Sequence, residues 1–165
     1  MKILRDHGMN PNKKYWHDVI GFNYRMTNLQ AALGIAQLKK IEQLIAKKRQ
    51  IATTYKKLLQ DLTTITPAPE MTWAKNVYWL YSILVKKKFR DKIIEHLERQ
   101  GIETRPFFYP IHALPPYKRN LTLPVAEELS ARGLNLPSGP RLSENQIQQT
   151  VESLREALEK LKAFS

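Results

Sequence analysis

A run of apolar residues from Leu29 to Leu62 most constrains what this chain can fold into. Its members recur at intervals of three and four residues: Leu29, Ala32, Leu33, Ala36, Ile41, Leu44, Ile45, Ile51, Ala52, Tyr55, Leu58, Leu59 and Leu62. That spacing is the period of an α-helix with one apolar face. Because a single helix of this length is unusual in a globular domain, we expect a bend or break near Lys39 and Lys40.

The rest of the chain alternates predicted strands with predicted helices. Residues 77–85 are rich in β-branched and aromatic side chains, which is typical of a strand buried on both faces. A capping box of Ser143 and Gln146 marks the start of the last helix. The other expected strands are 102–105 and 134–136, and the expected helices are 90–100, 125–132 and 143 to about Ala163. This order predicts an α/β fold in which helices, led by one long helix that is bent or broken, cover a small sheet.

Charge and composition narrow the functional classes. The chain of 165 residues has a net charge of +12, and a strongly basic chain suggests nucleic acid as a binding partner. The basic residues, however, are spread over several sites and alternate with the apolar face of the predicted helix, as solvated positions do. A nucleic-acid-binding domain therefore stays a minor alternative, and the sequence favours a solvated basic surface.

Membrane and thiol chemistry are not expected. No run of about 18 apolar residues is present, so no membrane span is predicted. The chain contains no cysteine, which excludes disulfide and thiolate chemistry and is compatible with a cytoplasmic location. His7, His17 and His96 lack the spacing of metal ligands, so no metal site is expected.

A polar turn precedes the long helix. Asn23, Tyr24 and Arg25 offer an amide, a phenol and a guanidinium within three residues, and these groups hydrogen-bond phosphates and carboxylates. The same three residues also suit the end of a turn, a half-buried ring and a solvated charge. Thr27 or Asn28 is expected to cap the helix that follows.

Four segments, in this order, resemble the C-terminal half of the DegT/DnrJ/StrS family of pyridoxal-phosphate-dependent sugar aminotransferases. They are Leu4–Met9, Gly21–Leu38, Gly101–His112, and Pro124–Ser130 leading to Leu136–Pro140. The last two look most like the perosamine synthase branch, which aminates a GDP-linked 4-keto-6-deoxy sugar. The resemblance implies the small C-terminal domain of a fold-type I aminotransferase, over residues 27–165. Residues 1–26 are then an arm from a larger domain that is missing.

The resemblance also implies roles for single residues. Asn23 would reach across a dimer interface to the cofactor phosphate of the neighbouring subunit, and Tyr24 would share this contact or pack beneath it. Arg25 would suit the substrate diphosphate or the carboxylate of the amino donor. Tyr109 and His112 lie on a proline-rich loop that would contact the nucleotide sugar. His112 would bind a sugar hydroxyl or a phosphate, or only cap the loop.

No residue of this chain is expected to be catalytic. In the resembling family the lysine that forms the Schiff base lies upstream of the Leu4–Met9 segment, and no lysine here has a recognisable cofactor context. Pyridoxal phosphate, a homodimer and glutamate as donor are therefore expected of a longer enzyme, and the chain alone is expected to be inactive. The alternative is a truncated, non-catalytic remnant that binds a nucleotide sugar or a partner chain.

Overall fold

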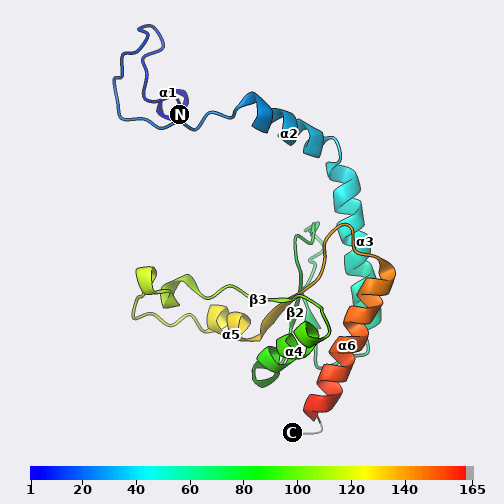
Figure 1. Cartoon of the computed structure of the whole chain (residues 1–165). Coiled ribbons are helices and arrows are strands. Elements are labelled where there is room, and N and C mark those ends of the chain that lie inside the picture. Colours follow the sequence, from blue (N-terminus) through cyan, green and yellow to red (C-terminus); the bar gives the residue numbers. More distant parts are fainter. Residues whose placement is uncertain (163–165) are drawn as a thin grey trace. The chain divides into compact units, whose positions relative to one another are not determined.

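The computed structural model describes residues 1–162 (Figure 1). The chain divides into two compact units, Met1–Glu42 and a larger one that begins at Gln43. Each unit is described by itself. The expected end of the last helix, near Ala163, lies outside the described residues.

The first unit contains two helices joined by a long looped segment. Helix α1 (Lys2–Arg5) is a single turn, where the sequence predicted an extended arm. Helix α2 (Asn28–Leu38) begins with the expected cap: Thr27 Oγ1 accepts a hydrogen bond from Gln30 N, and Gln30 Oε1 accepts one from Thr27 N. All residues of α2 are described and none of them is buried, although most are apolar. Leu29, for example, is 82% exposed.

The long apolar period is divided into two helices where a break was expected. Helix α2 ends at Leu38, and α3 (Ile41–Leu59) begins after two residues. Lys39 N donates to Ile35 O, whereas Lys40 N donates to Gln37 O, at 3.0 Å in both cases. The shift to a bond spanning three residues tightens the backbone, as commonly happens where an α-helix ends.

The second unit is built on a four-stranded antiparallel sheet in the order β1-β2-β4-β3. The strands are β1 (Thr66–Pro67), β2 (Tyr81–Leu84), β3 (Arg105–Pro106) and β4 (Gly133–Leu136). In the central pair, Tyr81 lies opposite Leu136 and Ile83 lies opposite Leu134. Since paired residues share a face of the sheet, these four side chains form one apolar surface. The expected α/β class, with a small sheet covered by helices, is confirmed.

Helices α3, α4 (Lys87–Arg99) and α6 (Glu144–Lys162) supply the rest of the core. Figure 1 shows them gathered beside the sheet, while the short α5 (Pro124–Arg132) leads directly into β4. Their buried apolar residues recur at helical spacing: Ile51, Ala52, Tyr55, Leu59, Phe89, Ile93, Leu97, Ile147, Val151, Leu154, Ala157 and Leu158. The core is therefore made where each helix buries its apolar stripe.

The predicted strand 77–85 was too long, and it is not apolar on both faces. Tyr78 has a φ of 48°, in the left-handed region, and its N–H donates to Asn76 Oδ1 at 2.8 Å. This turn breaks the extended conformation, so β2 begins only at Tyr81. On the other face of the sheet, Ser82 Oγ donates to Asn135 Oδ1 at 2.7 Å, where apolar contacts were expected.

Two further strand predictions need correction. The expected strand 102–105 is displaced, because Gly101 (φ 73°) ends α4 and Ile102 N then donates to Leu97 O. Pairing with β4 starts only at Arg105. Strand β1 was not predicted, and its Pro67 is tolerated because β1 is an edge strand.

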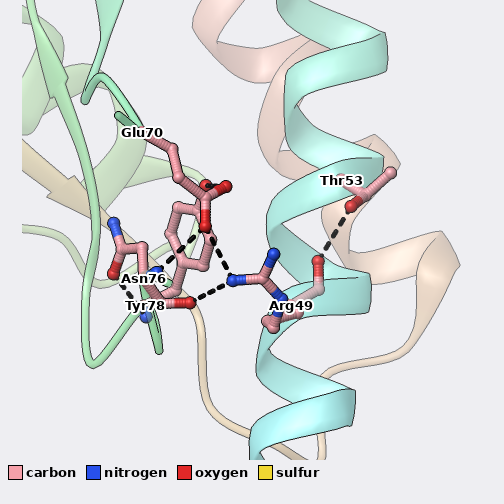
Figure 2. A network of polar contacts seen from close by, with 5 residues as sticks. All are labelled: Arg49, Thr53, Glu70, Asn76 and Tyr78. Atoms are coloured by element: carbon pink, nitrogen blue, oxygen red, sulfur yellow. Dashed lines mark hydrogen bonds and ion pairs between the residues drawn. The ribbon is translucent and has the colours of Figure 1, made fainter. Parts of the chain in front are cut away.

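Two cations of α3 that were interpreted as solvated hold distant loops. Lys48 Nζ donates to Trp79 O at 2.9 Å and to Ser138 O. Arg49 Nη1 donates to Glu70 Oε1 at 2.8 Å and also to Asn76 O. Figure 2 shows that Glu70, Asn76 and Tyr78 converge on Arg49 from the loop before β2.

The loop before β2 is closed by the carboxylate of Glu70. This carboxylate accepts from Arg49 Nη1, from Asn76 N at 2.9 Å and from Tyr78 OH at 3.1 Å. The Arg49 guanidinium, followed by the Asn76 amide, lowers the pKa of Glu70 from 4.5 to about 2. Because the pKa in the folded state is the lower one, this network stabilises the fold above pH 4.5, and the stabilisation is lost as the pH falls to about 2.

The Arg49→Ala variant should raise the titration midpoint of Glu70 from about 2 towards 4.5, because the carboxylate loses its charged donor. Carbon-13 NMR of the glutamate carboxyl groups measures this midpoint directly. The matched control is Arg99→Ala, which removes an exposed ion pair with Glu95 elsewhere and should leave Glu70 unchanged. An unaltered Glu70 midpoint in Arg49→Ala would show that the guanidinium does not hold this loop.

Candidate functional site

The first candidate site is formed by two segments that lie side by side in the first unit. Phe22 N donates to Leu4 O at 2.7 Å, His7 N donates to Phe22 O at 3.0 Å, and Tyr24 N donates to Arg5 O at 2.9 Å. Asp6 and Asn23 form an antiparallel bridge between these bonds. Two of the four segments that carry the family resemblance, Leu4–Met9 and Gly21–Leu38, are thus joined by backbone hydrogen bonds.

Two glycines permit this close approach. Gly8 has a φ of 70°, and an added Cβ would lie 1.8 Å from Val19 O. A Cβ on Gly21 would lie 2.0 Å from Gly8 N. His7 precedes Gly8 with a φ of 58°, so the backbone takes two left-handed residues in succession. The turn therefore needs glycine at both positions to bring Asn23 beside Asp6.

The side chains at this bridge gather around Arg25. Its Nη1 lies 3.2 Å from Asp6 Oδ1, and its Nη2 lies 3.5 Å from His7 Nε2. Asn23 Oδ1 accepts a long bond of 3.5 Å from Arg25 Nε. Within residues 1–162 no acceptor contacts Asn23 Nδ2, so its two N–H groups are available to a ligand. Tyr24 is exposed, and its ring stacks on Phe22 at 5.4 Å between centroids.

The second candidate site is the loop from Pro106 to Leu123 in the second unit. It contains two short 3-10 turns, Ile111–Ala113 and Pro115–Tyr117. A hollow of about 540 Å³ is lined by Pro110, Ile111, His112, Pro116, Tyr117, Lys118, Arg119, Leu121, Leu123 and Ala126. Its size and its mixture of apolar and cationic groups suit a small anionic molecule.

His112 and Tyr109 have different surroundings although they are close in sequence. The His112 side chain is only 11% exposed, and its Nε2 lies 3.0 Å from Glu127 Oε1. Tyr109 is 71% exposed and does not line the hollow. His112 Nε2 therefore fastens the loop to Glu127, and its binding of a sugar hydroxyl or a phosphate stays a prediction. In the described chain, Nδ1 of His112 has no protein partner.

The predicted site residues fall into two groups, one in each unit. Asn23, Tyr24 and Arg25 share the first unit, whereas Tyr109 and His112 share the loop of the second. Sequence reasoning missed Asp6, His7 and Glu127, which hold members of these two groups. All three occur in segments that carry the family resemblance, and this was the one signal that pointed to them.

Residues 1–162 contain neither a metal-binding cluster of side chains nor a membrane-spanning helix. No group of three or more His, Cys, Asp or Glu side chains could hold a metal ion there. No helix in this part of the chain is long and apolar enough to cross a membrane.

Residues 1–155, which include both loops, match the DegT/DnrJ/EryC1/StrS aminotransferase family. The chain belongs to this family. GDP-perosamine synthase from Escherichia coli O157:H7 is 42% identical over 155 residues, which are 93% of this chain and 42% of that protein. GDP-perosamine synthase from Caulobacter vibrioides is 37% identical over 164 residues, or 96% of this chain and 44% of that protein.

A solved aminotransferase structure agrees with the fold. It is PseC of Helicobacter pylori, an aminotransferase involved in the biosynthesis of pseudoaminic acid, with a TM-score of 0.87 and 29% identity. The likeness covers 96% of this chain and 45% of PseC. The chain thus spans less than half the length of these three proteins.

Gly8→Ala should separate the two segments of the first site, because the added Cβ has no room and the residue must keep a positive φ. Amide hydrogen exchange at His7 and Phe22, which donate across the contact, should become faster. Gly34→Ala is the matched control: its Cβ meets nothing within 4 Å, and alanine in a helix is favoured by about 0.5–1 kcal/mol. Unchanged exchange in Gly8→Ala would contradict the proposed need for glycine.

Proposed function

We propose that this chain is the C-terminal part of a pyridoxal-phosphate-dependent enzyme that aminates a nucleotide-linked 4-keto-6-deoxy sugar, as a perosamine synthase does, for polysaccharide biosynthesis. The observation that carries the proposal is the family match, which spans both candidate loops. The relatives named GDP-perosamine synthase support the choice of a GDP-linked sugar.

The first site is proposed to hold the cofactor phosphate. The amide of Asn23 fits this group, because its Nδ2 has no acceptor among residues 1–162 and can donate two hydrogen bonds without adding charge. Tyr24 is exposed beside it and is proposed to share the contact through its phenol. When bound, pyridoxal phosphate would supply the electron sink that amino transfer needs.

Arg25 is proposed to bind the substrate diphosphate or the carboxylate of the donor. Asp6 contacts one of its terminal nitrogens at 3.2 Å. A guanidinium has five N–H donors, so this ion pair leaves several of them for a second anion. Asp6 then fixes the direction of the side chain, at the cost of reducing its net charge.

The second site is proposed to bind the nucleotide sugar. His112, Lys118 and Arg119 line the hollow of about 540 Å³, and together they offer an imidazole and two cations to a diphosphate or a sugar hydroxyl. Tyr109 is exposed on the same loop, and its ring is proposed to contact the same substrate from outside the hollow.

The proposal includes the organisation of the whole enzyme. Residues 1–26 would be an arm from a preceding large domain that supplies the catalytic lysine, and residues 27–165 would form the small domain. The active form would be a cytoplasmic homodimer that takes its amino group from glutamate. The exposed apolar side chains of α2 support burial against another part of such an assembly.

The decisive test uses the complete protein that contains this chain, loaded with pyridoxal phosphate. Incubation with glutamate and a GDP-linked 4-keto-6-deoxy sugar should replace the keto oxygen by an amino group, and mass spectrometry of the sugar measures this exchange. Binding of the nucleotide sugar without any amination would favour the non-catalytic alternative.

In the complete enzyme, Asn23→Ala and His112→Ala should fail in different ways. Loss of a hydrogen bond to a charged group costs about 1.5–3 kcal/mol, so Asn23→Ala should weaken cofactor binding roughly ten- to hundredfold. His112→Ala should raise KM for the nucleotide sugar and leave cofactor affinity near normal. Absorbance titration and steady-state kinetics separate these effects, and equal loss of cofactor in both variants would contradict the assignment.

A mixed dimer tests whether Asn23 acts across the subunit interface. One chain carries Asn23→Ala, and the other has its catalytic lysine replaced by alanine. If Asn23 serves the neighbouring subunit, one site combines an intact lysine with an intact asparagine and regains full activity. If Asn23 serves its own subunit, both sites stay defective, and the proposed contact between subunits must be abandoned.

A further inference from the structure

The loop that carries His112 is fastened at its base by a single carboxylate oxygen. Glu127 Oε1 accepts from His112 Nε2 at 3.0 Å and from Leu123 N at 2.9 Å. Both donors line the hollow, and most of its other lining residues lie between them in sequence. One side chain of α5 therefore closes a loop of ten intervening residues.

His112 connects Glu127 to the far side of the loop. Its backbone oxygen accepts from Arg119 N at 3.2 Å, so the far side of the loop also returns to it. Lys118 and Arg119, which follow the second 3-10 turn, are placed by this contact. The ring of His112 is held by Glu127, and its backbone oxygen holds the side of the loop that carries both cations.

Glu127 also determines which nitrogen of His112 carries a proton. The backbone N–H of Leu123, followed by the imidazole, holds the pKa of Glu127 below its usual value, so the carboxylate is ionised and acts only as an acceptor. Nε2 of His112 must then be the donor. In the neutral imidazole this leaves Nδ1 as an acceptor for a hydroxyl, and in the charged form Nδ1 donates to a phosphate.

We propose that Glu127 is the positioning residue of the nucleotide-sugar site, closing the loop from His112 to Leu123 and presenting His112 Nδ1 to the substrate. This inference rests on the proposed function, because it assigns the hollow to the nucleotide sugar. It adds a residue that touches no substrate itself. Glu127 acts through His112.

The test compares variants of the complete enzyme. Glu127→Ala should raise KM for a GDP-linked 4-keto-6-deoxy sugar about tenfold, with kcat and cofactor affinity little changed. Glu127→Gln keeps an acceptor oxygen and should recover part of this loss. The matched control is Glu128→Ala, which removes the neighbouring carboxylate and its ion pair with Arg132 and should leave KM unchanged.

A double variant shows whether Glu127 acts through His112. The KM of His112→Ala combined with Glu127→Ala should be close to that of the more impaired single variant, because the two residues form one unit. Fully additive effects, or an unchanged KM in Glu127→Ala, would overturn the proposal.

A measurement without substrate keeps this inference separate from the proposed function. Trypsin should cleave after Lys118 and Arg119 faster in Glu127→Ala than in Glu128→Ala, and nitrogen-15 NMR should show His112 losing its preference for a protonated Nε2. If the enzyme aminates no nucleotide sugar but these two changes occur, the closure of the loop by Glu127 is confirmed and the substrate assignment fails. If neither change occurs, the closure of the loop by Glu127 is refuted.

Discussion

The pairing of β4 with both β2 and β3 is the constraint on which the second unit depends. Helices α3, α4 and α6 pack on the apolar face of the central pair. The loop that carries His112 starts just beyond β3 and returns through α5 to β4, so the sheet holds both of its ends. Phe107 N donates to Gly133 O at 3.2 Å, and the Phe107 ring occupies the place that a Cβ on Gly133 would need.

Both candidate sites use the same physical arrangement. A carboxylate contacts a nitrogen-bearing side chain from one side: Asp6 contacts Arg25, and Glu127 contacts His112. The contact fixes the direction of the long or rotatable group and leaves other nitrogens for a ligand. Positioned donors of this kind suit anions such as phosphates, because the protein has already ordered the groups that bind them.

The sequence predicted local features well and long-range contacts poorly. The break between α2 and α3, the Thr27 cap and the capping box of Ser143 were found, because each depends on residues within one or two helical turns. The start of β2 was missed, since the left-handed Tyr78 donates its N–H to the Asn76 side-chain oxygen, and this bond competes with β propensity. The roles of Lys48 and Arg49 were missed because their partners lie in distant loops.

The same limit applies to the candidate sites. Asn23 and His112 were selected through the family resemblance, which the family match supports over residues 1–155. Their supporting residues Asp6 and Glu127 lie 15 or more residues away in sequence, and no helical or strand period connects them. Only the folded backbone shows that they meet.

We propose that two separate loops of this chain serve two ligands, a cofactor phosphate and a nucleotide sugar. A crystal structure of the complete protein with pyridoxal phosphate and a GDP-linked sugar tests it most directly. Asn23 Nδ2 should lie within hydrogen-bonding distance of the cofactor phosphate of the neighbouring subunit, and His112 Nδ1 should contact the nucleotide sugar. A cofactor phosphate remote from Asn23, with the nucleotide sugar outside the hollow of His112, would contradict it.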